Sequence, residues 1–502
     1  MRFGAWMAAL LCAGATAFAA TSGTTCESLA SLKLKNAAVS MAAPVAAGEF
    51  PAPAGRGPAP NFKDLPAFCR VALTLTPSSD SDIKVEVWLP STNWNGKFEG
   101  TANGAYAGAI GYAALADALR RGYAAANTDT GHTGNSASFA IEHPEKTIDF
   151  GYRAVHEMSV QAKAVVTAFY GSAPKLSYWN GCSTGGRQAL QEAQKYPNDY
   201  DGIVAGAPAN NTSRMTMMQL NVGQAIHKDE ASYLPPAKFK AIHEAVLAAC
   251  DANDGVKDGV LENPMHCKFD PQVLACKGAE SDACLTAPQI AALRRIYAPT
   301  INPRTKEYIF PGLEPGGELG WSMMLGPEPF SYADEFWKYM VIKDPKWDYM
   351  TLNFATDLPK ALAADHGIVD ATDPNLAPFF SHGKLIQYHG WGDPGIPPEN
   401  SVNYYNQVKE TVGAAKVKES YRLFMVPGMA HCRGGEGTDT FDMLGALERW
   451  VEQGTAPERI LASRVKDGKT DRTRPLCAYP QEAIYNGSGS TDEAANFTCK
   501  VR

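Results

Sequence analysis

Apolar and polar positions in the first part of the chain follow two periods in turn. Residues 82–89 alternate apolar and polar side chains, which predicts a half-buried strand, and residues 152–170 have the spacing of a long helix. Short apolar runs at 176–179 and 202–206 flank a helical stretch at 186–195. Strand, turn, helix and strand in this order predict the sheet of an α/β-hydrolase.

The pattern breaks between residues 209 and 381 and then returns. This stretch is rich in proline, glycine and aromatic residues and offers helical pieces with few strand signals. Beyond it, apolar runs at 385–389 and 421–426 predict two further strands. The predicted fold class is therefore α/β, with an α/β-hydrolase catalytic domain made of 20–208 and 382–502 and a large lid domain inserted at 209–381.

The N-terminus has the features of an export signal. Arg2 precedes an apolar run that is too short to span a bilayer, and the A-x-A sequence at 17–19 matches a cleavage site. Residues 1–19 are predicted to be a signal peptide, and the mature protein to be secreted, either extracellular or periplasmic, without a membrane anchor. The alternative, a buried N-terminal helix, is disfavoured by the Ala/Pro/Gly-rich sequence that follows. Prolines preclude a regular helix in the second half of 20–66, which is predicted to be an extended lead-in.

The charge and the cysteine content indicate which partners and which cellular compartment to expect. A net charge of -7 over 502 residues, with no Lys/Arg run, disfavours a nucleic-acid partner. Removing Cys12 with the signal peptide leaves ten of the 11 cysteines, an even number that is typical of disulfide bonding in an exported chain. No C-x-x-C pair occurs, so a zinc site is not expected. Closeness along the chain favours the pairs Cys250–Cys267, Cys276–Cys284 and Cys477–Cys499, although the sequence alone leaves the pairing open.

The first chemical motif is Gly181-Cys182-Ser183-Thr184-Gly185, a G-x-S-x-G sequence between a predicted strand and a predicted helix. Its glycines allow a tight turn that exposes the serine as a nucleophile. The helix that follows directs backbone N–H groups at the site, and the N–H of Thr184 is a candidate donor to an oxyanion. The motif alone is moderate support for a nucleophile, and its context strengthens that interpretation.

A base and a residue to orient it follow in the order that α/β-hydrolases require. Asp393 comes directly after the predicted strand at 385–389, and His431 lies in a loop after the next strand. A histidine within reach would remove the proton of Ser183, and a carboxylate on its other nitrogen would hold the tautomer. Taken singly, His431 reads equally well as a loop histidine and Asp393 as a turn former. Their order and spacing together predict a catalytic triad.

Two neighbouring features depend on this triad. If Ser183 and His431 meet, Cys182 and Cys432 come close enough to form a disulfide that clamps nucleophile to base, which leaves Cys26 and Cys69 as the last pair. A second oxyanion donor is expected from the glycine-containing loop at 100–108, at Gly104 or Ala105. The alternative for this loop is a flexible surface turn.

An acidic loop lies between Cys250 and Cys267. Residues 251–260 contain several carboxylates and two glycines, which suits a hard cation such as Ca²⁺. The loop is not an EF-hand, because Val256 occupies the position that requires glycine. Composition favours a calcium site and a solvated acidic turn about equally.

Taken together, these motifs resemble those of the tannase/feruloyl esterase family. The resemblance covers nearly the whole mature chain and rests on the sequences at 93–98, 181–186, 392–393 and 428–432. It implies an α/β-hydrolase core, a large lid, a Cys182–Cys432 disulfide and a structural Ca²⁺ in the lid. The ligands it implies are the carboxylates of Asp251, Asp254 and Asp258 and the carbonyls of Val256 and Val260.

The resemblance implies a serine esterase that acts on small esters of aromatic acids, with the plant cell wall as one candidate source. We rank feruloyl esters first, galloyl esters second and terephthalate monoesters third. Terephthalate monoesters are included because the bacterial mono(2-hydroxyethyl) terephthalate hydrolase looks like a relative of this family. A terephthalate needs a cation for its free carboxylate, and residues 312–347 contain only three lysines, although Arg294, Arg295 or Arg304 could reach the pocket. Aromatic lid residues could stack on a phenolic ring or form the lid core; they are Trp321, Phe330, Phe336, Trp337 and Trp347.

Two other classes of function are weighed against this one. A non-catalytic ligand-binding exoprotein on a degenerate hydrolase fold is disfavoured by the intact triad. A peptidase or a lipase would use the same triad, and a lipase would also need a long apolar acyl channel.

Overall fold

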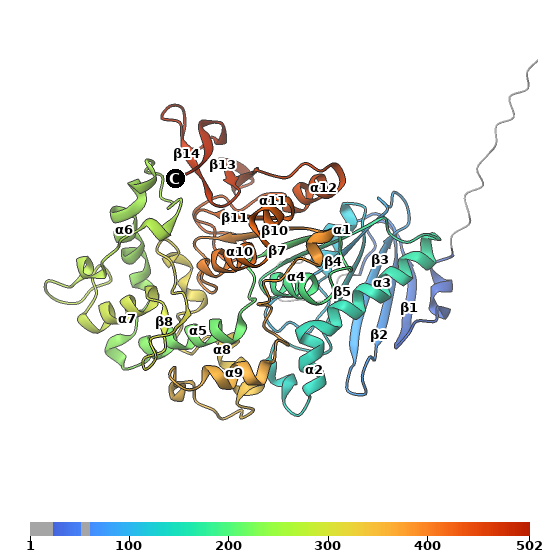
Figure 1. Ribbon diagram of the computed structural model, residues 1–502, viewed down its shortest axis with the longest axis horizontal. Coiled ribbons are helices and arrows are strands. Elements are labelled where there is room, and N and C mark those ends of the chain that lie inside the picture. Colours follow the sequence, from blue (N-terminus) through green and yellow to red (C-terminus); the bar gives the residue numbers. More distant parts are fainter. Residues whose placement is uncertain (1–23, 52–60) are drawn as a thin grey trace, which may run out of the picture.

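A nine-stranded sheet forms the centre of the computed structural model, which describes residues 24–51 and 61–502. Its strands are ordered β1-β2-β3-β5-β4-β6-β7-β10-β11 (Figure 1). Strands β1 to β3 and β5 pair antiparallel, and the rest of the sheet is parallel. The strands are β1 (Ala37–Val45), β2 (Phe68–Leu75), β3 (Ile83–Pro90), β4 (Lys97–Thr101), β5 (Ala124–Thr128), β6 (Leu176–Cys182), β7 (Gly202–Gly206), β10 (Lys384–Gly390) and β11 (Tyr421–Val426).

The strand β1 corrects the expected lead-in. Residues 20–66 were expected to be an extended lead-in, but residues 37–45 within it form a strand that pairs with β2 along its whole length. Pro44 is tolerated because β1 is the edge strand of the sheet, where one row of backbone groups faces no neighbour. The predicted signal peptide at 1–19 lies outside the described residues.

Helices cover both faces of the sheet, because each face carries apolar side chains that must be buried. The apolar residues of α3, α4, α10 and α11 pack on one face, and those of α1 and α12 pack on the other. These helices are α1 (Tyr112–Arg120), α3 (Ala154–Tyr170), α4 (Thr184–Lys195), α10 (Glu399–Val412), α11 (Ala414–Ser420) and α12 (Met443–Gln453), with a short α2 (Pro144–Ile148) before α3. The sheet and its helices form an α/β-hydrolase core.

The segment between β7 and β10 forms a separate helical body beside the sheet, coloured green to orange in Figure 1. Its apolar side chains form their own hydrophobic core, joined by a few residues that precede α3. Because β7 and β10 are neighbouring parallel strands, the segment leaves the sheet at its carboxyl edge, after β7, and returns to the opposite edge, where β10 begins. It contains α5 (Thr212–Ile226), α6 (Phe239–Cys250), α7 (Ala287–Tyr297), α8 (Ser331–Glu335), α9 (Leu358–Asp365) and the hairpin of β8 (Thr300–Ile301) and β9 (Tyr308–Phe310).

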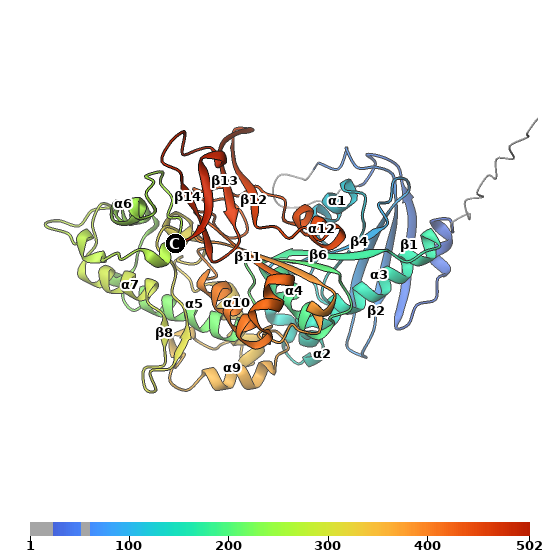
Figure 2. The same cartoon turned by 45° about the horizontal axis from the view of Figure 1, so that its top comes forward.

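Two C-terminal hairpins extend beyond α12. They are formed by β12 (Arg459–Lys466) with β13 (Lys469–Cys477) and by β14 (Gln481–Tyr485) with β15 (Phe497–Val501). In both Figure 1 and Figure 2 they stand between α6 of the inserted segment and the sheet. Within the two described ranges, no helix is long and apolar enough to cross a bilayer.

Five disulfides cross-link the described chain. The structure forms every pair expected from the sequence: Cys26–Cys69, Cys182–Cys432, Cys250–Cys267, Cys276–Cys284 and Cys477–Cys499. Four of them close 8 to 43 residues, whereas Cys182–Cys432 closes 250.

Candidate active site

Ser183 occupies the tight turn between β6 and α4. Its backbone has a φ of 65°, a left-handed conformation that non-glycine residues rarely adopt. A side chain at Gly181 would place its Cβ 2.6 Å from Ala102 Cβ, so glycine is required for this close approach. The turn is held by a backbone hydrogen bond from Ser183 N to Gly206 O of 2.9 Å. Because β6 ends here, the serine hydroxyl is presented at the carboxyl edge of the sheet.

Asp393 and His431 meet at the same edge, after β10 and β11. His431 Nδ1 lies 2.6 Å from Asp393 Oδ2, and Asp393 Oδ1 accepts hydrogen bonds from the backbone N–H groups of Gly395 and Ile396 at 2.9 Å each. Burial alone would raise the pKa of Asp393, but the charge of His431 and hydrogen bonds from two histidines outweigh it and hold that pKa well below its usual value. Asp393 therefore stays ionised and fixed in orientation.

The pKa of His431 is set by its burial and by its contact with Asp393. Burial tends to lower the pKa of His431, but the Asp393 carboxylate raises it further than burial lowers it, so the net direction is upward. His431 and Ser183 line one cavity. No hydrogen bond joins Ser183 Oγ to His431 among the described residues, and such catalytic contacts commonly tighten only when substrate binds.

His389 is a part of this site that sequence reasoning missed. It is fully buried on β10, and its Nε2 lies 3.1 Å from Asp393 Oδ2, the same oxygen that contacts His431. Its Nδ1 lies 2.7 Å from Ser401 Oγ, so the imidazole has a partner on each side. His389 thus helps to fix the orientation of the Asp393 carboxylate through its contact with Oδ2. The sequence carried one signal for it, a histidine at the end of a predicted strand four residues before Asp393.

The Cys182–Cys432 disulfide joins the two loops that carry nucleophile and base. Each cysteine is the direct neighbour of a reactive residue, and their Cα atoms are 6.1 Å apart. A cross-link at this place restricts the relative movement of Ser183 and His431. That restriction keeps the two side chains facing the same cavity.

The expected oxyanion donors come from two loops that contact each other. Thr184 begins α4 and is fully buried, and its hydroxyl donates to the carbonyl of Ala105 at 3.0 Å. Ala105 lines the cavity beside Ser183, whereas Gly104 is not among the lining residues. The geometry therefore favours Ala105 over Gly104 within the loop at 100–108, and the donor role of both loops stays a prediction.

The cavity at Ser183 is small and mostly apolar. It measures about 60 Å³, and its walls include Met215, Phe330 and Ile396. Two polar side chains in the wall are buried and incompletely bonded: Gln219 Oε1 and the Tyr332 hydroxyl have no hydrogen-bond partner among the described residues. A larger cavity of about 440 Å³ between α5, β9 and α10 is not lined by Ser183 or His431, so it is separate from this chemistry.

The whole-chain comparisons agree with this geometry. The family described as tannase and feruloyl esterase matches residues 69–500. The chain belongs to this family. An uncharacterized esterase of Xanthomonas campestris pv. campestris is 40% identical to this chain. The match covers 97% of this chain and 93% of that esterase. A probable feruloyl esterase B-2 of Aspergillus terreus is 36% identical over 86% of each chain.

Solved structures of relatives superpose along nearly the whole length of this esterase. Feruloyl esterase B from Aspergillus oryzae gives a TM-score of 0.88 at 33% identity, covering 95% of this chain and 99% of that one. Tannin acyl hydrolase from Aspergillus niger gives a TM-score of 0.78 at 22% identity, covering 94% and 93%. The second likeness shows a shared fold. The family and these relatives identify this chain as a carboxylic ester hydrolase of the feruloyl esterase/tannase type.

Most aromatic residues of the inserted segment are structural. Trp321, Phe336 and Trp337 are buried in its hydrophobic core, and Trp347 stacks on Trp337 with ring centroids 5.9 Å apart. Phe330 alone of these five lines the cavity at Ser183. One aromatic wall is therefore available from this set to contact an acyl ring.

The acidic loop of this esterase is partly arranged for a hard cation. Four of the five expected ligands line a cavity of about 10 Å³, enough for one ion or water, together with the half-buried Glu262. These oxygen donors fit Ca²⁺. The fifth, Asp251, accepts hydrogen bonds from the backbone N–H groups of Asp258 and Gly259 at 3.3 and 3.1 Å.

Two arginines of β13 also face this loop. Arg474 is ion-paired with Asp258, and Arg472 Nη1 lies 3.6 Å from the same carboxylate. The loop therefore connects the inserted segment to the C-terminal hairpins. Calcium binding there stays a prediction, because the arginines already neutralise part of its charge.

Proposed function

We propose that this protein hydrolyses aromatic carboxylic esters through a covalent acyl-enzyme, with Ser183 as nucleophile, His431 as general base and then acid, and Asp393 as the residue that orients His431. The observation that carries the proposal is the 2.6 Å hydrogen bond between His431 and a fully buried Asp393, made at the rim of the cavity that Ser183 lines.

The geometry supports the following steps. Ser183 Oγ attacks the ester carbonyl carbon while its proton passes to His431, and N–H groups of Thr184 and Ala105 stabilise the oxyanion. The tetrahedral intermediate collapses, and the alcohol leaves with the proton from His431. Water then attacks the carbonyl carbon of the acyl-enzyme and gives a proton to His431, and the aromatic acid is released as His431 passes this proton to Ser183 Oγ.

The substrate ranking rests on the cavity wall. An apolar cavity with Phe330 in its wall suits an aromatic acyl group. Gln219 Oε1 lacks a partner, so a phenolic hydroxyl of the substrate would supply the missing donor. We place feruloyl esters first, since they bring one such hydroxyl, and galloyl esters, which bring several, second.

Terephthalate monoesters stay third, because a free carboxylate needs a cation. No lysine or arginine is among the described residues that line the cavity. The three arginines that were candidates are engaged elsewhere: Arg294 pairs with Asp270, Arg295 donates to Asn221 and Arg304 donates to the carbonyl of Ala355.

Substitution of the nucleophile tests the proposed catalytic role of Ser183. Ser183→Ala is expected to lose at least about 10⁴-fold in kcat on a chromogenic ester. Near-normal turnover by this variant would point to another nucleophile, whereas absence of turnover by the wild type would favour a binding protein.

The acyl preference is tested with matched esters. Turnover of methyl ferulate, methyl gallate and mono(2-hydroxyethyl) terephthalate is compared first, and the ranking is wrong if the ferulate is the poorest. Gln219→Leu is then expected to lower kcat/KM for methyl ferulate by about tenfold more than for methyl cinnamate, which lacks the hydroxyl. Equal losses for both esters would assign Gln219 only a packing role.

We also propose export and a structural calcium ion. Five disulfides fit an extracellular protein, and the signal peptide predicted at 1–19 would direct it there. Ca²⁺ would be held by Asp251, Asp254 and Asp258 with the carbonyls of Val256 and Val260. It would stabilise the junction of the inserted segment with the C-terminal hairpins, so a chelator is expected to lower the melting temperature, and calcium-free protein of unchanged stability would contradict this.

A further inference from the structure

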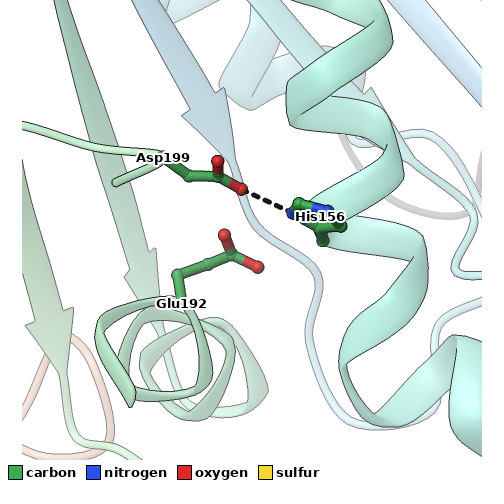
Figure 3. A group of neighbouring side chains, drawn as sticks. All are labelled: His156, Glu192 and Asp199. Carbon is green, nitrogen blue, oxygen red and sulfur yellow. Dashed lines mark hydrogen bonds and ion pairs between the residues drawn. The ribbon is translucent and has the colours of Figure 1, made fainter. Parts of the chain in front are cut away.

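Three side chains of types that can bind a metal ion converge between α3 and α4. They are His156 of α3, Glu192 of α4 and Asp199, which precedes β7 (Figure 3). One ligand atom from each lies within 4.8 Å of the others. Among the described residues, this is the single group of three such side chains that meets this distance.

The buried carboxylate of Glu192 lacks the hydrogen-bond donors that a carboxylate requires. The residue is 1% exposed, and neither of its carboxylate oxygens has a hydrogen-bond partner among the described residues. A buried carboxylate without donors is costly, because it loses hydration and gains nothing in return. In Figure 3 its carboxylate points toward the space shared with His156 and Asp199.

The surroundings hold the other two side chains in place. His156 Nδ1 lies 2.7 Å from Asp199 Oδ2, and the Tyr196 ring stacks on the imidazole with centroids 3.7 Å apart. Lys163 Nζ donates to the backbone carbonyl of Asp199. The side chains of His156 and Asp199 are 26% and 16% exposed, so a small ion can enter from solvent.

We propose that His156, Glu192 and Asp199 form a binding site for a divalent transition-metal ion, with Zn²⁺ as the best fit. One imidazole nitrogen with two carboxylates favours Zn²⁺ over Ca²⁺ and Mg²⁺, which prefer all-oxygen ligands. Water completes a fourth position on the exposed side. The ligands come from three separate parts of the chain and include no cysteine, so the C-x-x-C criterion could not detect them.

The role of this ion is structural. None of its ligands lines the cavity at Ser183, so it takes no part in ester hydrolysis. It would join α3 to α4, the helix that begins directly after Ser183. Binding to the folded chain alone raises the melting temperature.

Zinc retention tests the site. The full chain is equilibrated with Zn²⁺, dialysed against metal-free buffer and assayed for metal. We expect about one equivalent to be retained by the wild type and almost none by His156→Ala or Glu192→Gln. His143→Ala is the matched control, because His143 and Asp80 form a similar pair at 2.9 Å that lacks a buried third carboxylate; it should retain zinc like the wild type.

A second measurement keeps the test decisive if a variant fails to fold. Co²⁺ is titrated into the unaltered chain, where it should give visible absorption that Zn²⁺ abolishes, and Zn²⁺ should raise the melting temperature by a few degrees. Absence of retained zinc and of cobalt absorption overturns the proposal, as does equal retention by Glu192→Gln. A proton shared between Glu192 and Asp199 would then account for the unpartnered oxygens.

Discussion

Two histidine–aspartate pairs of nearly the same geometry lie near α4. His431 Nδ1 is 2.6 Å from Asp393 Oδ2 at the turn before the helix, and His156 Nδ1 is 2.7 Å from Asp199 Oδ2 beside its last turns. The first pair shares a cavity with Ser183, and the second faces Glu192. The two histidine–aspartate pairs thus have the same geometry and differ in the residue beside them. We expect acid–base chemistry where that residue is Ser183 and ion binding where it is Glu192.

Burial separates the two pairs as well. Asp393 is fully buried and receives four hydrogen-bond contacts, two from backbone N–H groups and two from histidines. Asp199 is partly open to solvent. A closed, fully bonded carboxylate fixes one tautomer and orientation of its histidine, whereas an open one leaves room for a ligand.

The largest effect on this comparison is expected from Asp393→Asn. An asparagine preserves the shape but holds His431 in the wrong tautomer, so kcat should fall by about 10⁴-fold. The measurement is steady-state turnover of methyl ferulate. Asp80→Asn, which alters the exposed pair with His143, is the control and should stay within about twofold of the wild type. Similar losses in both variants would show that the effect is not specific to the Asp393 carboxylate.

The second prediction concerns the clamp between nucleophile and base. Cys182→Ala/Cys432→Ala should lower kcat by about 10²-fold, because small displacements of reacting groups are costly. The chain-entropy model gives an upper value of about 5.5 kcal/mol of stability for a loop of this length, which a melting curve measures separately. Cys276→Ala/Cys284→Ala removes a cross-link of separation 8 in the inserted segment and should leave kcat nearly unchanged. An active double variant at the clamp would show that packing alone positions His431.

The third prediction addresses His389 as a positioning residue. His389→Ala leaves Asp393 Oδ2 with one histidine contact in place of two, which should lower kcat by about tenfold with KM unchanged. The acid limb of the pH profile should move to higher pH, because a carboxylate with one donor fewer attracts the His431 imidazolium more strongly. A lower melting temperature with an unmoved limb would indicate a packing role only.

The fourth prediction, with the smallest expected effect, concerns the pH dependence of kcat/KM in the wild type. His431 must be neutral to accept the proton of Ser183, and its pKa is raised above the ordinary value of 6.5. Activity is therefore lost as the pH falls through this raised pKa, and the midpoint of the acid limb in kcat/KM should lie above 6.5. In Asp393→Asn the residual activity should show a midpoint at lower pH. A midpoint below the ordinary value in the wild type would contradict the electrostatic role of Asp393.

Local patterns in the sequence determined the reactive parts of this protein. A strand–turn–helix signal surrounds Ser183, and strand ends precede Asp393 and His431, so their order along the chain already predicted a shared edge of a sheet. The disulfide partners followed from the same reasoning or from closeness along the chain. These features are readable because each depends on a few neighbouring residues and on the rule that parallel strands end together.

Only the tertiary structure decided the residues that act through distant contacts. His389, Gln219 and Glu192 lie on ordinary strand or helix positions, and their significance comes from burial beside residues far away in the sequence. The strand β1 was missed because its alanine-rich sequence has weak strand preference and forms by pairing with β2. Propensity is local, whereas burial and pairing are set by the whole fold. That is the physical reason why the sequence predicted Ser183, Asp393 and His431 as a triad but not the buried side chains that contact them.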